Sequence, residues 1–292
     1  MSEQLHSIEE VLQDLKAGKP VIIVDDESRE NEGDLIIAAE FVTQENINFM
    51  VKYARGIVCT PMRREALEKL GIPAMVAKNT DNHETAFTVT VDHVDTTTGV
   101  SPAERAYTIQ KLLDPTAKPQ DFRRPGHVFP LVYKEGGVLV RQGHTEASID
   151  LCRLAGLQEV AVICEITKDN GDMARLPDLM KFAKEHDLKI ASVAELIEYR
   201  KQLQEQGLDT VEANEQLGFP ADMREYSLAA QIIRFLGINS IRLLTNNPEK
   251  RHGLEHWGIN VTSRVPLIIA ANKFNAGYLK TKEEKMGHML ED

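Results

Sequence analysis

Apolar and polar residues follow one another along the chain with two periods, which predict a succession of helices and strands. Residues 7–17 place apolar side chains three and four positions apart, as expected for an amphipathic helix that ends near Gly18. The runs at residues 20–25 and 35–40 are almost continuously apolar, which is typical of strands buried on both faces. Helices and strands are therefore mixed from the start of the chain.

The same mixture continues to about residue 200. Further helices are predicted at residues 44–55, 63–70, 101–113, 145–155 and 177–187, and a last one opens at the capping box Ser192-Val193-Ala194-Glu195. Further strands are predicted at residues 56–60, 87–91, 128–132, 138–140, 160–166 and 189–193. Thr145 is expected to cap its helix and Gly156 to end it. The pattern predicts an α/β (α+β) domain over residues 1–200, with a mixed β-sheet surrounded by helices.

A polar segment at residues 199–207 is the expected domain boundary. Beyond it, residues 201–292 predict a smaller, truncated α/β unit, whose elements are a helix at 227–236, a strand at 240–244, a helix at 248–257, a strand at 259–262 and a polar C-terminal helix. Acidic residues outnumber basic ones by ten before this boundary and by only one after it. The difference indicates two units of different origin.

Composition narrows the classes to which the protein can belong. The net charge of −11 disfavours nonspecific binding to nucleic acid, and no apolar run is long enough for a membrane-spanning helix. The polar N-terminus does not resemble a signal peptide. The three cysteines are widely spaced, which fits reduced thiols and offers no zinc-binding pair. We therefore expect a cytoplasmic protein with neither a membrane nor a nucleic acid as its partner.

The segment from Asp25 to Asp34 directly follows an apolar run and carries a dense run of charge. It contains six acids and one arginine in ten residues, and like charges at this spacing repel one another. A divalent metal with oxygen ligands would relieve that repulsion, and so would a substrate rich in hydroxyl groups. Alternatively, the segment is a solvated acidic turn.

Two further clusters each allow a catalytic and a structural interpretation. Arg123-Arg124-Pro125-Gly126-His127 is a basic turn before an apolar strand, so His127 is either a catalytic residue or an ordinary turn residue. Cys164-Glu165-Ile166-Thr167 ends a buried strand, so Glu165 is either an acid–base group or a hydrogen-bonded structural one. Cys59 and Cys164 lie in apolar stretches and are expected in the core rather than as nucleophiles.

The last cluster, Arg141-Gln142-Gly143-His144-Thr145-Glu146, lies at a predicted helix start. A helix N-terminus attracts anions, so a phosphate could bind there beside Arg141, with Thr145 donating its hydroxyl. Neutral His144 could instead hold a metal alongside a carboxylate. Together, the clusters indicate metal-assisted enolisation of a sugar phosphate. The chain contains no glycine-rich nucleotide fingerprint, no Ser-His-Asp elbow and no thiol-activation motif.

In this order, the four clusters resemble 3,4-dihydroxy-2-butanone-4-phosphate synthase, a riboflavin-pathway enzyme that acts on ribulose 5-phosphate. The resemblance covers residues from about 5 to 200 and rests on Asp25–Asp34, Thr97–Ser101, Arg124–Pro130, Gly143–Ala147 and Cys164–Ile166. It implies that the C4 carbon of the substrate leaves as formate after enolisation and rearrangement. It also implies a homodimer with active sites near the subunit interface.

The same resemblance implies roles for the candidate residues. Glu30 and His144 would hold Mg²⁺ or Mn²⁺. His127 and Glu165 would be essential for proton transfer. The residues implied to bind the substrate are Arg29, Glu30, Asp34, Arg141, His144, Thr145 and Glu165. Elementary chemistry agrees, because a metal stabilises enediolate charge while acid–base groups move the protons.

The second unit resembles the C-terminal half of GTP cyclohydrolase II. The matching segments are Gly207–Asn214, Leu217–Phe219, Leu243–Pro248, Tyr278–Lys282 and Lys285–His288. The resemblance implies that Asp222 is a proton acceptor and Arg224 a nucleophile, with Thr245 and Lys250 in contact with GTP. The segment before Pro248 leads into a predicted helix N-terminus that could receive phosphate.

The second unit also departs from that family. The front half of the family, with its zinc-binding cysteines, is absent, and no cysteine follows Cys164. Zinc is therefore not expected, and opening the guanine ring lacks a zinc-activated water. We predict that residues 201–292 have no GTP cyclohydrolase II activity and instead pack, dimerise or bind a nucleotide weakly. The alternative is a bifunctional protein with residual activity or a nucleotide-sensing role.

Two competing functions remain to be separated for residues 1–200. The first is another metal-dependent sugar-phosphate isomerase or aldolase, which would release no formate. The second is a catalytically silent regulator, which would have lost its catalytic residues. Glu30, His127, His144 and Glu165 are all present, so the regulator is the weaker reading for this part of the chain and the stronger one for residues 201–292.

Overall fold

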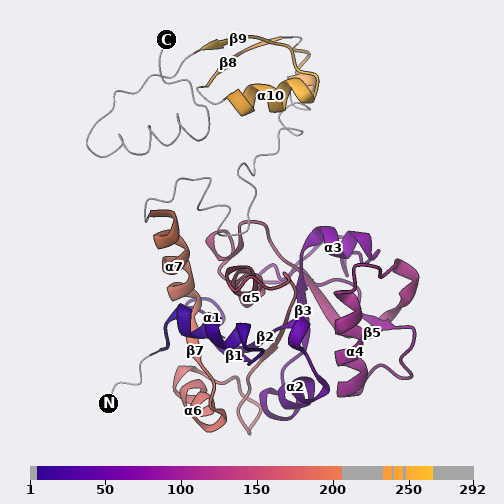
Figure 1. The fold of residues 1–292 in the computed structure, drawn as a ribbon, viewed down its shortest axis with the longest axis vertical. Coiled ribbons are helices and arrows are strands. Elements are labelled where there is room, and N and C mark those ends of the chain that lie inside the picture. Colours follow the sequence, from indigo (N-terminus) through magenta and orange to yellow (C-terminus); the bar gives the residue numbers. More distant parts are fainter. Residues whose placement is uncertain (1–4, 206–232, 239, 246–247, 266–292) are drawn as a thin grey trace. The chain divides into compact units, whose positions relative to one another are not determined.

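Residues 5–205, 233–238, 240–245 and 248–265 are described by a computed structural model of the chain (Figure 1). Two units follow one another in sequence, Met1–Lys201 and Gln202–Asp292. Among the described residues, no helix is both long and apolar enough to span a lipid bilayer.

One mixed sheet forms the centre of the first unit. Its strands are β1 (Val21–Val24), β2 (Gly33–Ala38), β3 (Cys59–Met62), β4 (Val91–His93), β5 (Phe122–Val132), β6 (Ala161–Glu165) and β7 (Ile190–Ser192). They lie in the order β4-β5-β3-β6-β2-β1-β7. β1 is parallel to β7 and β3 to β5, whereas the other neighbours are antiparallel. The predicted mixed β-sheet is therefore confirmed.

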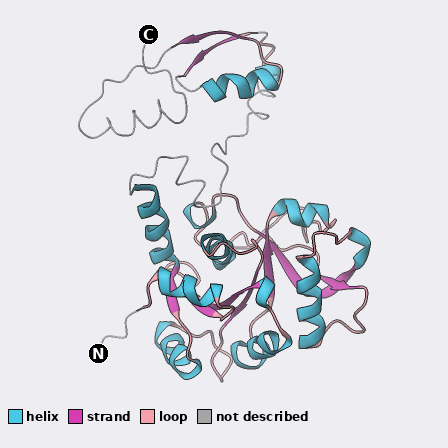
Figure 2. Ribbon diagram, in the orientation of Figure 1, coloured by secondary structure: helices cyan, strands magenta, loops and turns pink. Residues whose placement is uncertain are grey.

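Helices cover both faces of this sheet (Figures 1 and 2). The α-helices are α1 (Ile8–Lys16), α2 (Gln44–Phe49), α3 (Arg64–Lys69), α4 (Pro102–Leu112), α5 (His144–Leu154), α6 (Leu176–His186) and α7 (Val193–Glu205). The apolar residues of α1, α5 and α7 form one buried cluster with Ile36 and Ala38 of β2. Those of α2, α4 and α6 form a second cluster with Leu35 and Ile37. Because side chains alternate along a strand, β2 contributes to both cores.

Short elements connect these helices and strands. They are η1 (Ala39–Phe41), η3 (Pro119–Asp121) and η4 (Gly137–Leu139), which are 3₁₀ turns, and η2 (Met50–Ala54), a π-helical turn that continues α2. The strand predicted at 138–140 is wrong, because this segment is the η4 turn. Gly136 and Gly137 both adopt positive φ angles, which curl the chain away from an extended course.

The alternating residues 87–91 also differ from prediction. Phe87 and Thr88 make only isolated bridges, and the strand β4 begins at Val91. Serine side chains lie at the start of three helices. Ser7 caps α1 and Ser101 caps α4 through bonds to backbone N–H groups, and Ser192 exchanges hydrogen bonds with Glu195 at the start of α7.

The described part of the second unit contains β8 (Ile241–Leu244), α10 (Pro248–His256) and β9 (Val261–Val265). The two strands are parallel, and Leu254, Ile259 and Val261 form a small buried cluster. The helix and the two strands predicted there are present, with β9 shifted toward the C-terminus. The C-terminal helix, most of the helix predicted at 227–236, and the candidate residues Asp222 and Arg224 lie outside the described residues.

Candidate active site

The acidic loop between β1 and β2 is folded around the carboxylate of Asp25. Asp25 accepts a hydrogen bond from the Arg29 guanidinium at 2.8 Å and from the backbone N–H groups of Glu30 and Glu32 at 3.1 and 2.8 Å. Its side chain is fully buried. These bonds fix the loop, so the side chains of Arg29 and Glu30 are held in place rather than dispersed in solvent. Sequence reasoning gave Asp25 no role, and the structure gives it this one.

Asp34 is the buried acid of the loop. It lies on β2 opposite Glu165 of β6, so two carboxyl groups are cross-strand neighbours. Burial raises the pKa of Asp34 to about 8, and the charge of Glu165 adds to the shift, against the opposing effect of His144. The pKa of Asp34 therefore lies well above that of an ordinary aspartate.

His144 begins α5, one residue earlier than predicted. The N-cap is Gly143, so the prediction that Thr145 caps this helix is wrong. The ring Nδ1 lies 3.6 Å from Oε2 of Glu30 and 3.7 Å from Oδ1 of Asp34. Burial lowers the pKa of His144, but the surrounding carboxylates outweigh burial and raise it to about 9. The imidazole therefore carries an extra proton at neutral pH.

Glu30 completes this group. Burial opposes its ionisation, but its contacts with His144 and Arg29 prevail and lower its pKa to about 2. Its Oε2 lies 3.0 Å from the Arg29 guanidinium. Glu30 is thus an ionised oxygen ligand beside a protonated imidazole.

The residues present fit a divalent cation. One ligand atom from each of Asp25, Glu30 and His144 lies within 4.8 Å of the others. Asp34 Oδ1 and His144 Nε2 are buried without a hydrogen-bond partner, and each such atom costs about 1–3 kcal/mol. Asp25 already accepts three hydrogen bonds, so Glu30, Asp34 and His144 are the better placed ligands. An ion held mainly by oxygens, in place of the protons, suits Mg²⁺ or Mn²⁺.

Two guanidinium groups converge on the N-terminus of α5. A Cβ atom added to Gly143 would lie 2.5 Å from Nη1 of Arg141 and 2.9 Å from Nη2 of Arg29. Arg141 is itself fixed by Glu146, whose Oε2 is 2.6 Å away. Thr145 follows in the first turn of the helix and is buried. Two arginines, a threonine hydroxyl and a helix N-terminus are an arrangement that binds a phosphate group.

Arg141 also fixes a loop that the sequence did not predict as part of the site. Its guanidinium donates to the backbone carbonyl of His83 at 2.9 Å and to the hydroxyl of Thr85 at 3.0 Å. A turn closed by Asp81, which accepts from the N–H groups of both residues, holds this loop. His83 and Thr85 consequently face the same cleft as the predicted residues.

Glu165 ends β6 at the floor of the site. Its Oε2 accepts a hydrogen bond from the backbone N–H of Ile57 at 2.8 Å. A Cβ atom added to the neighbouring Gly56 would lie 2.4 Å from that same oxygen. The absence of a side chain at Gly56 therefore lets the backbone approach and fix this carboxylate.

Many of these residues line one cleft with a volume of about 400 Å³. Its walls are Arg29, Glu30, Glu32, Asp34, Cys59, His83, Thr85, Phe87, Leu131, Arg141, His144, Thr145, Ile163 and Glu165. All seven residues that were predicted to bind the substrate are among them. Cys59 is buried, and burial raises the pKa of its thiol, so it is a neutral wall residue.

His127, the other predicted catalytic residue, is not part of this wall. It lies on β5, on the same side of the strand as Leu131. The rise along the strand places it roughly 13 Å from that wall residue. Its ring Nδ1 is 2.7 Å from Oδ2 of Asp92 on the edge strand β4. The structure therefore brings the other predicted residues together and leaves His127 apart within one chain.

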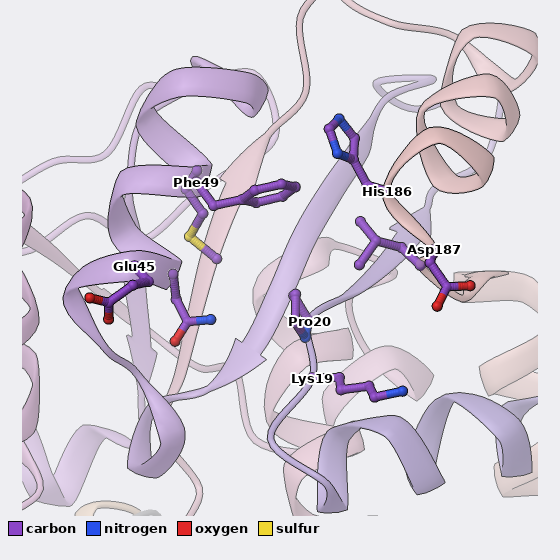
Figure 3. A pocket seen from close by; sticks show the side chains of 9 residues that line it. Lys19, Pro20, Glu45, Phe49, His186 and Asp187 are labelled. Carbon is purple, nitrogen blue, oxygen red and sulfur yellow. The ribbon is translucent and has the colours of Figure 1, made fainter.

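A second pocket lies elsewhere in the first unit, where α2 meets the C-terminal end of α6 (Figure 3). The rings of Phe49 and His186 meet edge to face there, with their centroids 5.0 Å apart. The residues that line it are Lys19, Pro20, Glu45, Asn46, Phe49, Met50, His186, Asp187 and Leu188. None of these is a predicted site residue, so this mainly apolar pocket is separate from the cleft.

Known protein families and proteins resemble both parts of this chain. The sequence profile of the 3,4-dihydroxy-2-butanone 4-phosphate synthase family matches residues 9–199, and that of GTP cyclohydrolase II matches residues 183–266. A riboflavin biosynthesis protein RibBA from Bacillus mycoides is 42% identical over 98% of this chain and 99% of its own length. That alignment extends over 393 positions, more than the 292 residues of this chain, so part of the relative has no counterpart here.

Solved structures are similar to the first unit. A 3,4-dihydroxy-2-butanone 4-phosphate synthase in complex with two magnesium ions is 43% identical, with a TM-score of 0.65 over 68% of this chain and 98% of that one. RibBX, a two-domain synthase of this kind from A. baumannii, is 51% identical with a TM-score of 0.65. The match covers 67% of this chain and 58% of RibBX.

Proposed function

Because the chain belongs to the 3,4-dihydroxy-2-butanone 4-phosphate synthase family, and is therefore a lyase of riboflavin biosynthesis, we propose how its residues perform the reaction. Residues 1–200 form the synthase domain, which converts ribulose 5-phosphate into 3,4-dihydroxy-2-butanone 4-phosphate and formate. The observation that carries this proposal is the cleft in which Glu30, Asp34, His144 and Glu165 meet beside two arginines.

The substrate phosphate binds at the N-terminus of α5. Arg29 and Arg141 supply the charge, and Thr145 supplies a hydroxyl donor. Because Arg141 is tied to Glu146 and to the loop at His83 and Thr85, it is already oriented before the substrate arrives. Such preorganisation reduces the entropic cost of holding the sugar in one pose.

Glu30 and His144 hold the metal, with Asp34 beside them. When bound, a divalent cation stabilises negative charge on the substrate oxygens. Glu165 transfers the protons. The backbone N–H of Ile57 donates a hydrogen bond to its Oε2, so Oε1 is the oxygen that takes the proton whose removal starts enolisation. Manganese can replace magnesium in this proposal, because both ions accept oxygen ligands in similar number.

The active protein is a homodimer in which His127 serves the cleft of the partner subunit. The position of His127 supports this part, since it lies outside the cleft of its own chain and its side chain is 46% exposed. The three cysteines are free and buried, which fits a reducing, cytoplasmic location.

Product analysis tests the proposed reaction. Ribulose 5-phosphate with Mg²⁺ should yield equimolar formate and the four-carbon product, and EDTA should abolish both. Turnover without formate would instead indicate a sugar-phosphate isomerase or aldolase. Activity that survives EDTA would contradict the metal assignment.

Mixing two inactive variants tests the shared site. In a dimer of one His144→Ala chain and one His127→Ala chain, one cleft keeps its own His144 and receives an intact His127. A random mixture should therefore recover about a quarter of the parent activity, because half of the dimers are mixed and each has one working cleft. A mixture that stays inactive, although mixed dimers form, would contradict the proposal.

We further propose that residues 201–292 are a partial GTP cyclohydrolase II-like domain without that activity. The last cysteine of the chain is Cys164, so this unit has no thiolate with which to bind zinc. Thr245 is buried and Lys250 half-buried in the described part, and both stay candidates for weak GTP binding. Release of formate and pyrophosphate from GTP in the presence of zinc would refute the loss of activity. A thermal shift with GTP would reveal nucleotide binding.

A further inference from the structure

His127 is placed on a bulge between the two strands at one edge of the sheet. The register of β4 and β5 pairs Val91 with Val128 but Asp92 with Arg123, so residues 124–127 form a bulge in β5. Bulges change the direction of side chains and occur next to active sites. The bulge exposes the imidazole of His127, whereas the carboxylate of Asp92 behind it is only 8% exposed.

Asp92 holds both the backbone and the ring of His127. Its Oδ1 accepts from the His127 backbone N–H at 2.8 Å, and its Oδ2 lies 2.7 Å from the ring Nδ1. Gly99 closes the other side of the carboxylate, where an added Cβ atom would lie 2.0 Å from Oδ2. The carboxylate therefore has one orientation, with one oxygen for each N–H of His127.

This geometry determines which ring nitrogen carries the proton. An ionised carboxylate only accepts hydrogen bonds, so the nitrogen beside it, Nδ1, is the donor in the neutral imidazole. Nε2 is then the nitrogen with a free lone pair, and it is the atom that can exchange a proton with a substrate.

We propose that Asp92 is the positioning residue for His127: it fixes the ring on the bulge and assigns the exchangeable proton to Nε2. The inference rests on the proposed catalytic role of His127 and extends it.

The competing explanation is that Asp92 only closes the bulge through the backbone bond. Asp92→Asn separates the two. The asparagine oxygen still accepts a hydrogen bond from the backbone N–H of His127, but the NH₂ group of the asparagine side chain now faces Nδ1. Because an NH₂ group can only donate, Nδ1 becomes an acceptor and the proton moves to Nε2.

The experiment measures kcat and KM for ribulose 5-phosphate and records the His127 tautomer by long-range ¹H–¹⁵N NMR at a pH where imidazoles are neutral. Asp92→Asn should move the proton from Nδ1 to Nε2 and lower kcat roughly a hundredfold with KM unchanged. The control is Thr90→Val, which removes a 3.0 Å bond to the Gly126 N–H in the same bulge. It should keep the parent kcat and tautomer.

Two results would overturn the inference. If Asp92→Asn keeps the parent kcat or the parent tautomer while His127→Ala is inactive, Asp92 only closes the bulge. If His127→Ala itself keeps activity, the proposed role of His127 fails, and the inference fails with it. The tautomer reports on geometry alone, so it distinguishes these two failures.

Discussion

His144 and His127 have opposite surroundings, although each follows a glycine directly and an arginine by three positions in the sequence. His144 is buried at a helix N-terminus among Glu30, Asp34 and Asp25, and its Nε2 has no hydrogen-bond partner. His127 is half-exposed on a sheet edge and bound by one carboxylate, that of Asp92. A ring among several acids is suited to exchanging its proton for a cation, and a ring oriented by one acid is suited to exchanging a proton with a substrate. Local surroundings, rather than residue type, therefore separate metal binding from acid–base catalysis here.

The largest effect is expected from the cleft. His144→Ala should lower kcat by at least about 10⁴-fold, because the several kcal/mol of charge stabilisation supplied by the metal are lost. Formate release and Mg²⁺ calorimetry measure the two losses, and circular dichroism checks the fold. His186→Ala, in the separate apolar pocket, is the matched control and should retain the parent kcat. Strong Mg²⁺ binding by His144→Ala would contradict the role of His144 as a metal ligand.

Replacing His127 on the bulge should lower kcat less and should leave the Mg²⁺ affinity unchanged. His127→Ala should lower kcat by about 10²- to 10³-fold, since a general acid–base group is lost. Its Mg²⁺ affinity should stay at the parent value because the ligands of the cleft are untouched. Calorimetry and steady-state kinetics on one preparation test both statements. Loss of Mg²⁺ binding would place His127 among the metal ligands instead.

The pH dependence of Mg²⁺ affinity should arise from the titratable groups of the cleft. The pKa of His144 is raised to about 9, so below that pH a cation must displace a proton, and its affinity falls as the pH falls. Mg²⁺ affinity should therefore rise about tenfold per pH unit, between pH 6 and 8, for each proton that the cation displaces. His144→Gln should reduce this slope. The remaining slope should come from Asp34, whose pKa is raised to about 8. An affinity that does not change with pH would contradict the proposed exchange.

The smallest effect is expected outside both regions. A chain that ends after Glu205 keeps α7 and the buried pair of Arg200 with Asp150, whose atoms are 2.5 Å apart. This truncated chain should retain the parent kcat and KM for ribulose 5-phosphate. A tenfold loss of kcat would give residues 206–292 a part in the first reaction.

The central strands and their burial could be predicted, because apolar runs such as Val21–Val24 are typical of strands covered on both faces. The association of Glu30 with His144 could be predicted only through the family resemblance, since they are distant in sequence. Thr145 was misjudged as a cap because glycine can also begin a helix, and Gly143 does so here.

Other parts of the site leave no local pattern. Asp92 meets His127 across 35 positions of sequence, and Arg141 meets His83 across 58. Neither pair has a fixed spacing that a helix or turn imposes. The one signal that could have been used is the acid within the short apolar strand at Val91-Asp92-His93, because a buried carboxylate needs a partner.

Gly56 has a consequence for how this protein tolerates variation. Its φ angle is not among the positive ones, so its backbone conformation is not what requires glycine. Even alanine, however, would place its methyl group 2.4 Å from the carboxylate of Glu165. In a saturation-mutagenesis screen for growth without riboflavin, position 56 should score as intolerant as an essential acid. Conversely, a library that diversifies the cleft for new substrates should keep this position constant, because here empty volume, rather than a functional group, is what selection preserves.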